Sequence, residues 1–210
     1  MIQFDPIDHK YSLGDQPYFS VTQMLRGLKL TPPYPEGEDK GQKALGTACH
    51  KAADLVMWDR LDTDGTSLAL MPYVNGVIEK KREMNIRPIA TELILYDPVR
   101  CYAGTLDLFC FVYDSELAVF DYKRGGAPNC TELQTAGYET LLRQADQRGL
   151  IPPVMVGNDT RLALWMGYPI RRFSMKLEPN RAIVKEYSDP LDLAAWSGVV
   201  DLFKWKLRQK

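Results

Sequence analysis

The sequence lacks several features that mark common functional classes. Its 210 residues contain 26 Lys and Arg against 27 Asp and Glu, so the formal net charge is only −1. No basic field therefore covers the whole molecule, and a nucleic-acid partner would need a local patch or bound metal ions. The four cysteines form no C-x-x-C pair, which leaves a structural zinc site with little support.

Long apolar runs are also missing. No stretch approaches the roughly 18 to 20 apolar residues of a membrane span, and the opening MIQFDPIDHK has neither a charged leader region nor an apolar run. We therefore expect a soluble, cytoplasmic protein with free thiols and no membrane partner. The P-loop, G-x-G-x-x-G and G-x-S-x-G motifs are absent, so the chain carries no signature of an ATPase, a dinucleotide-binding enzyme or an α/β-hydrolase.

What is present suits one globular domain over residues 1–210, since hydrophobic residues make up 45% and charged residues 25% of the chain. We expect a hairpin, a short helix capped by Ser20 or Thr22, and a mobile loop over 31–41 within an N-terminal extension. A core follows over 42–150, and strands with a last helix over 151–210. Interspersed helices and strands predict an α/β fold with a mixed central sheet flanked by helices. The expected helices cover 43–61, 67–84, 131–148 and the segment after 190; the expected strands cover 90–97, 104–125 (as a hairpin), 161–167, 171–178 and 181–187.

The predicted hairpin GTLDLFCFVYDSELAVFDYKRG is the most apolar part of the chain, yet it holds Asp107, Asp121 and Lys123. Side chains alternate across a strand, so Asp121 and Lys123 share a face. A three-residue turn over 114–116 would pair Asp107 with Lys123 on that face, which is the register we favour, because carboxylate and ammonium attract each other. A two-residue turn over 114–115 would instead place Asp107 on the opposite face.

Buried carboxylates in a central strand are costly unless a counter-ion compensates them. Lys123 offsets one carboxylate, whereas a divalent cation offsets two. Hard oxygen ligands favour Mg²⁺ or Mn²⁺, and such an ion can polarise a phosphodiester. A purely structural alternative stays open, in which Asp107 and Lys123 form an ordinary cross-strand pair in a binding module.

The motifs G104-T-L-D107, D121-Y-K123 and Q134-T-A-G-Y138, with G46-T-A-C-H50 upstream, resemble the PD-(D/E)XK nuclease superfamily. The resemblance covers roughly residues 44–140. It is narrower with the RecB-type branch, which includes the nuclease domains of RecB and AddAB, CRISPR-associated nucleases and small phage exonucleases. It implies a restriction-endonuclease-like core and a bacterial or phage-infected cell.

The resemblance also implies roles for individual residues. His50, Asp107 and Asp121 would bind the metal with the backbone carbonyl of Tyr122, and Lys123 would be the catalytic lysine. Glu92 would bind a second metal ion or contact the residues that bind the first one. Gln134 and Tyr138, four apart on one helical face, would position the DNA backbone and the lysine region. Other groups that could contact DNA are Lys51, Arg124, Tyr138, Arg143, Arg171, Arg172 and the tail KWKLRQK.

Each of these residues also has a plainer interpretation. His50 could be a core histidine, Glu92 a solvent-facing strand residue, and Gln134 the second half of a capping box with Thr131. Iron–sulfur members of the branch have three cysteines beyond the Gln/Tyr helix; here no cysteine follows Cys130, so we expect no iron–sulfur cluster.

The function expected from sequence is therefore a divalent-metal-dependent DNA nuclease, most simply an exonuclease in DNA processing, recombination or repair. It would act on single strands or duplex ends, with an unidentified recombination or CRISPR-type partner protein. The alternative is a catalytically silent DNA-binding module or a structure-specific endonuclease of the same superfamily. The nuclease interpretation requires Asp107 and Asp121 to lie on the same side of the sheet.

Overall fold

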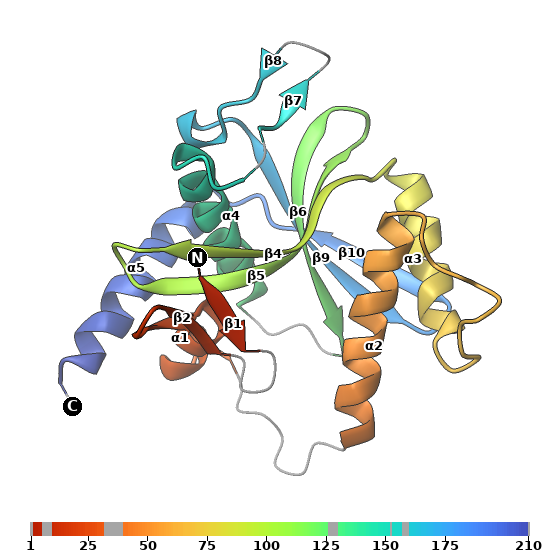
Figure 1. The fold of residues 1–210 in the computed structure, drawn as a ribbon, viewed down its shortest axis with the longest axis horizontal. Helices are drawn as coiled ribbons and strands as arrows, with labels where there is room; N and C mark the ends of the chain where they lie inside the picture. Colours follow the sequence, from red (N-terminus) through yellow and green to blue (C-terminus); the bar gives the residue numbers. More distant parts are fainter. Residues whose placement is uncertain are drawn as a thin grey trace.

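The predicted α/β class is confirmed: a mixed eight-stranded sheet is flanked by helices on both faces (Figure 1). The computed structural model describes residues 2–5, 10–31, 40–125, 130–151, 153–156 and 160–209. Most of the loop predicted over 31–41 lies outside these residues. The helices are α1 (Val21–Gly27), α2 (Lys40–Met57), α3 (Met71–Glu83), α4 (Thr131–Gln147), α5 (Leu191–Leu207) and a 3₁₀ turn, η1 (Leu164–Met166).

The main sheet has the order β1-β2-β3-β5-β6-β9-β10, with β4 on the other side of β5, and a separate ribbon is formed by β7 and β8. Two strand pairs of the main sheet are parallel (β3 with β5, β6 with β9), and the others are antiparallel. The strands are β1 (Gln3–Asp5), β2 (Lys10–Leu13), β3 (Gln16–Ser20), β4 (Arg87–Asp97), β5 (Tyr102–Val112), β6 (Glu116–Arg124), β7 (Met155–Val156), β8 (Thr160–Arg161), β9 (Ile170–Glu178) and β10 (Arg181–Glu186).

Strand β5 changes its partner midway along one edge. Its first edge pairs with β4 along almost its whole length. Its second edge pairs with β3 at Tyr102 and Ala103, and with β6 from Leu108 to Val112. The sheet therefore forks at residues 104–107, where β3 and β6 diverge from β5. The G-T-L-D motif found in the sequence occupies this fork.

Two apolar cores cover the faces of the sheet. One contains Phe109, Leu141 and Trp196 and lies against α1, α4 and α5. The other contains Met57 and Phe120 and lies against α2 and α3. All five of these side chains are 1% exposed or less, so the fork is held from both sides by close-packed hydrophobic layers.

Helix α1 begins as the sequence predicts. The Ser20 hydroxyl accepts a hydrogen bond from Gln23 N (3.0 Å), and the Gln23 side chain accepts one from Ser20 N (2.8 Å). This reciprocal capping box satisfies two backbone donors that a helix start leaves unpaired. The capping box with Thr131 that was the plainer interpretation of Gln134 does not form, because Cys130 is the N-cap residue of α4 and makes no side-chain cap.

The strand predicted over 161–167 is also wrong beyond its first residue. The chain there forms η1, which ends at Gly167 in a left-handed conformation (φ 89°). Asp146 of α4 accepts hydrogen bonds from the backbone N–H groups of Leu164 and Trp165, and Arg143 donates to Leu164 O. Side chains of α4 thus bind the backbone groups that a neighbouring strand would need.

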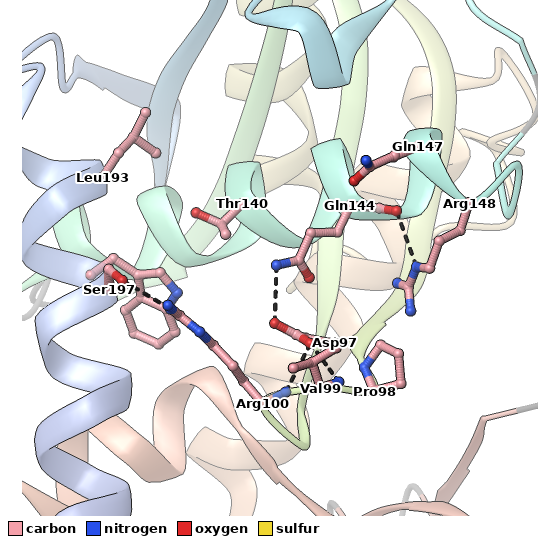
Figure 2. Close-up of a pocket in the computed structure, with 11 residues that line it drawn as sticks. Asp97, Pro98, Val99, Arg100, Thr140, Gln144, Gln147, Arg148, Leu193 and Ser197 are labelled. Carbon is pink, nitrogen blue, oxygen red and sulfur yellow. Dashed lines mark hydrogen bonds between the residues drawn. The ribbon is translucent and has the colours of Figure 1, made fainter.

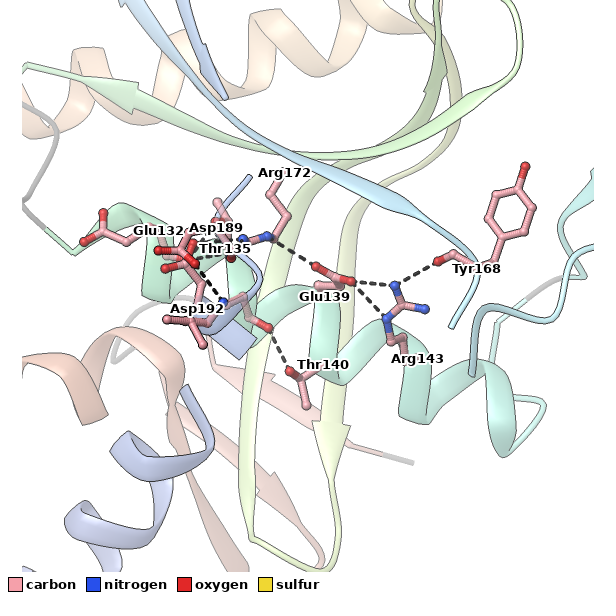
Figure 3. Close-up of polar contacts among 11 residues, drawn as sticks. Glu132, Thr135, Glu139, Thr140, Arg143, Tyr168, Arg172, Asp189 and Asp192 are labelled. Carbon is pink, nitrogen blue, oxygen red and sulfur yellow. Dashed lines mark hydrogen bonds and ion pairs between the residues drawn. The ribbon is translucent and has the colours of Figure 1, made fainter. Parts of the chain in front are cut away.

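A buried ion-pair network joins β9, α4 and α5 (Figure 3). Arg172, 4% exposed, lies 3.4 Å from Glu139 and 2.8 Å from Asp192 through its guanidinium nitrogens. Glu139 is shared with Arg143, which also donates to Tyr168 O. Arg172 and Arg143 were expected to contact DNA. The structure instead uses both guanidinium groups inside the protein, to fix α4 against the sheet.

The packing of α3 on β10 depends on Gly76. A β-carbon there would lie 2.5 Å from the backbone N of Ala182, whereas one at Gly198 of α5 would meet nothing within 4 Å. We predict that Gly76→Ala lowers the free energy of unfolding by about 1–3 kcal/mol, because backbone cannot yield as a side chain can. Gly198→Ala should raise it by about 0.5–1 kcal/mol through helix propensity. Urea unfolding of the two variants checks this; equal effects would contradict the packing.

Candidate metal centre

The β5–β6 turn has the odd length that the sequence argument required, but it starts one residue earlier than expected. Val112 pairs with Glu116, so the turn covers 113–115, and the preferred turn over 114–116 with its Asp107–Lys123 pair is wrong. Tyr113 and Asp114 both adopt positive φ (45° and 77°), which closes the turn early. Asn85 supports it with a 2.6 Å hydrogen bond to the Asp114 side chain.

This register keeps Asp107 and Asp121 together. The ladder ends at the pair Leu108 and Phe120, and the next positions along it are Asp107 and Asp121. Beyond the ladder, Asp107 Oδ2 accepts a 2.5 Å hydrogen bond from the backbone N–H of Tyr122. The two-residue turn, which would have separated the carboxylates, is excluded.

Three side chains converge at the fork. His50 of α2, Glu92 of β4 and Asp107 of β5 each offer one ligand atom, and these atoms all lie within 4.8 Å of one another. His50 Nδ1 is 3.5 Å from Asp107 Oδ1. Glu92 faces Asp107 across the strands, because its neighbours Thr91 and Leu93 pair with Leu108 and Leu106. An imidazole with two carboxylates is a donor set that can hold a divalent cation.

Glu92 reaches this position through an unusual backbone conformation. Its φ is +49°, in the left-handed region that non-glycine residues rarely adopt inside a strand. Such a conformation costs free energy of order 1–3 kcal/mol and is most often found at functional sites. The sequence suggested Glu92 as a subsidiary group or as a solvent-facing strand residue; the structure places it beside His50 and Asp107 at an exposed position.

The acidic groups of the centre repel one another. Desolvation and the neighbouring Asp107 carboxylate raise the pKa of Glu92 to about 7, and Asp54 adds to the effect. For His50, burial lowers the pKa, but the contact with Asp107 outweighs it, so the net shift is upward. A bound cation would relieve this repulsion, so the electrostatics fit an ion in the same position as the geometry does.

Asp121 and Lys123 form a second, adjoining unit. Lys123 Nζ is 2.6 Å from Asp121 Oδ2, and Gln134 of α4 bonds both: its Oε1 accepts from Lys123 (2.8 Å), and its Nε2 donates to Asp121 Oδ1 (3.0 Å). Nε2 also donates to Tyr138 Oη (3.0 Å). Both Asp121 oxygens are therefore engaged, and Asp121 is not part of the group with His50 and Glu92.

Burial raises the pKa of Asp121 and, taken alone, would lower the pKa of Lys123. The mutual attraction of the pair opposes the shift of the acid and raises the pKa of the lysine above its ordinary value. Lys123 is thus held as an ammonium beside the ligand group, with 17% of its side chain exposed. Gln134 bonds this lysine, and Tyr138 bonds Gln134.

Gly104 of the motif is required by packing. A β-carbon there would lie 2.8 Å from the Tyr138 ring and 3.3 Å from Val21, so only glycine lets the ring lie against the fork. Tyr138 is 6% exposed, which leaves little of its ring to stack on a base.

The remaining sequence candidates are dispersed. Lys51 is exposed and lines the same pocket as His50. Arg124 donates to Gln42 on α2, outside the pocket lining. Arg143 belongs to the buried network with Glu139. The Tyr122 ring is 1% exposed and packs edge-on against the His50 ring, with centroids 5.7 Å apart, while its backbone N–H donates to Asp107.

The centre opens into a pocket of about 970 Å³ whose lining includes Gly104, Thr105 and Asp107 of the fork. One wall comes from α2 and the other from α1 with the N-terminal strands. Sequence reasoning missed Asp54, which lies one helical turn after His50 and lines the pocket too. Its spacing of four residues from His50 was the only signal in the sequence.

A second cavity of about 490 Å³ lies at the turn between β4 and β5, against α4 and α5 (Figure 2). Its polar groups bond largely to each other. Asp97 accepts from Val99 N and from the Gln144 amide, and Arg100 donates to Ser197. It contains none of the residues predicted for the site.

Comparison with protein-family models and with curated proteins gave no match to this chain. The resemblance noted in the sequence therefore rests on its motifs alone. Within the described residues no helix is long and apolar enough to cross a membrane, and the candidate metal group includes no cysteine.

The pKa of Glu92 generates a test. Because the pKa of Glu92 is raised in the folded state, the folded protein binds the proton more tightly than the unfolded chain does. Relative to low pH, the ionised carboxylate therefore destabilises the fold increasingly as pH rises from 4.5 through about 7. In EDTA, Glu92→Gln should therefore raise the melting temperature increasingly between pH 5 and pH 8. Thermal melts of wild type and variant across this range check it.

Two further melts complete this test. At pH 8, Mn²⁺ should stabilise the wild type and have much less effect on Glu92→Gln. Glu79→Gln, at an exposed position on α3, is the matched control and should follow the wild type. An unchanged Mn²⁺ response in Glu92→Gln would remove Glu92 from the ligand group.

Proposed function

We propose that this protein is a divalent-metal-dependent DNA nuclease, most simply an exonuclease, that uses Mg²⁺ or Mn²⁺. The observation that carries the proposal is the convergence of His50, Glu92 and Asp107 beside the Asp121–Lys123 pair. A metal-ligand group that lines a large pocket, with a partly buried, charged lysine behind it, suits phosphodiester hydrolysis. The motif resemblance supplies the substrate class, DNA.

The ligand set that we propose differs from the one implied by the resemblance. His50, Glu92 and Asp107 would hold the ion, which supplies a Lewis acid for a phosphoryl oxygen and for water. Asp121 contacts Lys123 and Gln134 through its two oxygens and is not part of the group that His50, Glu92 and Asp107 form. Its role here is to keep Lys123 charged and oriented.

Lys123 would be the side chain that acts on the substrate directly. Its ammonium can donate to an oxygen of the scissile phosphate or to the attacking water, where negative charge develops in the transition state. Gln134 fixes its position from α4, and the ion-pair network around Glu139 fixes α4 against the sheet. A preorganised donor of this kind needs no rearrangement when the charge forms.

We predict that Asp107→Asn and Lys123→Met each reduce Mg²⁺- or Mn²⁺-dependent hydrolysis by at least about a hundred-fold, as the loss of an electrostatic group at a reacting centre does. Release of nucleotides from a linear, end-labelled DNA measures this, with EDTA as the blank. Asp64→Asn and Lys185→Met, at exposed positions outside the pocket, are the matched controls and should retain wild-type rates.

The same assay on covalently closed circular DNA tests the exonuclease proposal, because an enzyme that needs a strand end leaves the circle intact. Cleavage of the circle would instead indicate a structure-specific endonuclease. DNA binding without metal-dependent cleavage by wild type would favour a silent binding module. Full activity in Asp107→Asn would refute the site.

A further inference from the structure

The wall of the pocket opposite α2 carries an aromatic pair. Phe4 of β1 and Tyr11 of β2 are cross-strand partners, and their rings stack with centroids 4.7 Å apart and an interplanar angle of 28°. Both line the pocket that contains His50 and Asp107. Tyr11 is 6% exposed and Phe4 is less buried, so the pair presents Phe4 to the pocket with Tyr11 behind it.

A hydrogen bond fixes this pair relative to the candidate metal ligands. Tyr11 Oη lies 2.8 Å from Thr105 Oγ1 on β5. Thr105 and Asp107 both line the pocket and are two positions apart along the strand, a spacing of about 7 Å. The bond therefore ties the aromatic pair to the same strand that carries a metal ligand.

Polar groups adjoin the aromatic pair on the same wall. Gln23 and Arg26 of α1 line the pocket, whereas the carboxylates of Asp54, Glu92 and Asp107 come from α2, β4 and β5. The pocket thus combines an acidic group suited to a metal, an aromatic ring, and a cation with an amide. A nucleotide offers matching chemistry, since its base stacks on aromatic rings and its phosphates bind cations.

We propose that Phe4, backed by Tyr11, is a stacking subsite for the base of an unpaired nucleotide next to the scissile phosphate. This inference rests on the proposed nuclease function and names the form of the substrate strand. A base within a duplex has both faces covered by its neighbours, so stacking on Phe4 requires the strand to be unpaired at this position. Arg26 contacts a phosphate of the same strand.

The test is an abasic scan on linear single-stranded DNA. A series of oligonucleotides carries one tetrahydrofuran abasic site at successive positions around the linkage that is cut, and kcat/KM is measured for each. In wild type, one position beside the cut linkage should lose about ten-fold, the scale of one base–aromatic stack. In Phe4→Leu that selective loss should vanish. Trp165→Leu, at an exposed ring outside the pocket, should keep the wild-type profile.

A fluorescence titration tests binding to the subsite without requiring hydrolysis. Lys123→Met protein with Ca²⁺ is titrated into oligonucleotides that carry 2-aminopurine at each terminal position in turn. One position should be quenched on binding, and Phe4→Leu in the same background should abolish that quenching.

The outcomes separate the two proposals. Hydrolysis with a flat abasic profile in wild type, or an unchanged profile in Phe4→Leu, would overturn the subsite and leave the nuclease standing. Phe4-dependent quenching in a wild-type protein that never hydrolyses DNA would support the subsite and refute the nuclease. Efficient cutting within fully paired DNA, with no preference for an unpaired end, would also overturn the subsite.

Discussion

The candidate centre depends on the change of partner along one edge of β5. Among the described residues, β3 pairs with the start of that edge and β6 with its end, so no strand pairs with residues 104–107 there, and the pocket opens beside them. A continuous ladder would have covered Asp107 with backbone. The rest of the molecule keeps the fork open, since Gly104 admits the Tyr138 ring and Tyr11 ties the N-terminal strands to Thr105. Function in this account comes from an interruption of regular structure.

The same arrangement costs stability without an ion. Glu92 holds a left-handed backbone conformation, and its carboxyl lies where Asp107 and desolvation oppose its charge. Asp121 is 3% exposed and is compensated by Lys123. Natural sites often keep such strained and repelling groups where activity needs them. The neighbouring hydrophobic layers and the Arg172 network on α4 offset that cost.

Alternation and motif spacing were enough to predict the class of fold and several members of the site. Asp107, Asp121, Lys123 and Gln134 come together as expected, because strand parity and helix periodicity are properties of local sequence. The turn was misplaced by one residue, because the positive φ of Tyr113 and Asp114 depends on support from Asn85, a contact far along the chain. Rules based on neighbouring residues cannot predict a contact between residues 85 and 114.

The role of Glu92 as a candidate metal ligand and the contacts of Arg143 could not be predicted from the sequence either. Glu92 joins the group because β4 pairs with β5 in the register that sets it opposite Asp107, and Arg143 is held by an ion pair with Glu139. Both outcomes depend on which partner is near in space. The aromatic pair of Phe4 and Tyr11 was missed for the same reason, since its importance arises from the bond to Thr105.

The central proposal is that an ion binds between α2, β4 and β5. The most direct measurement is the anomalous scattering of Mn²⁺ in crystals of the protein. We predict a peak within coordination distance of His50, Glu92 and Asp107, with Asp121 still bonded to Lys123. A peak between Asp107 and Asp121 that excludes Glu92, or no ordered Mn²⁺ at the fork, would contradict the account.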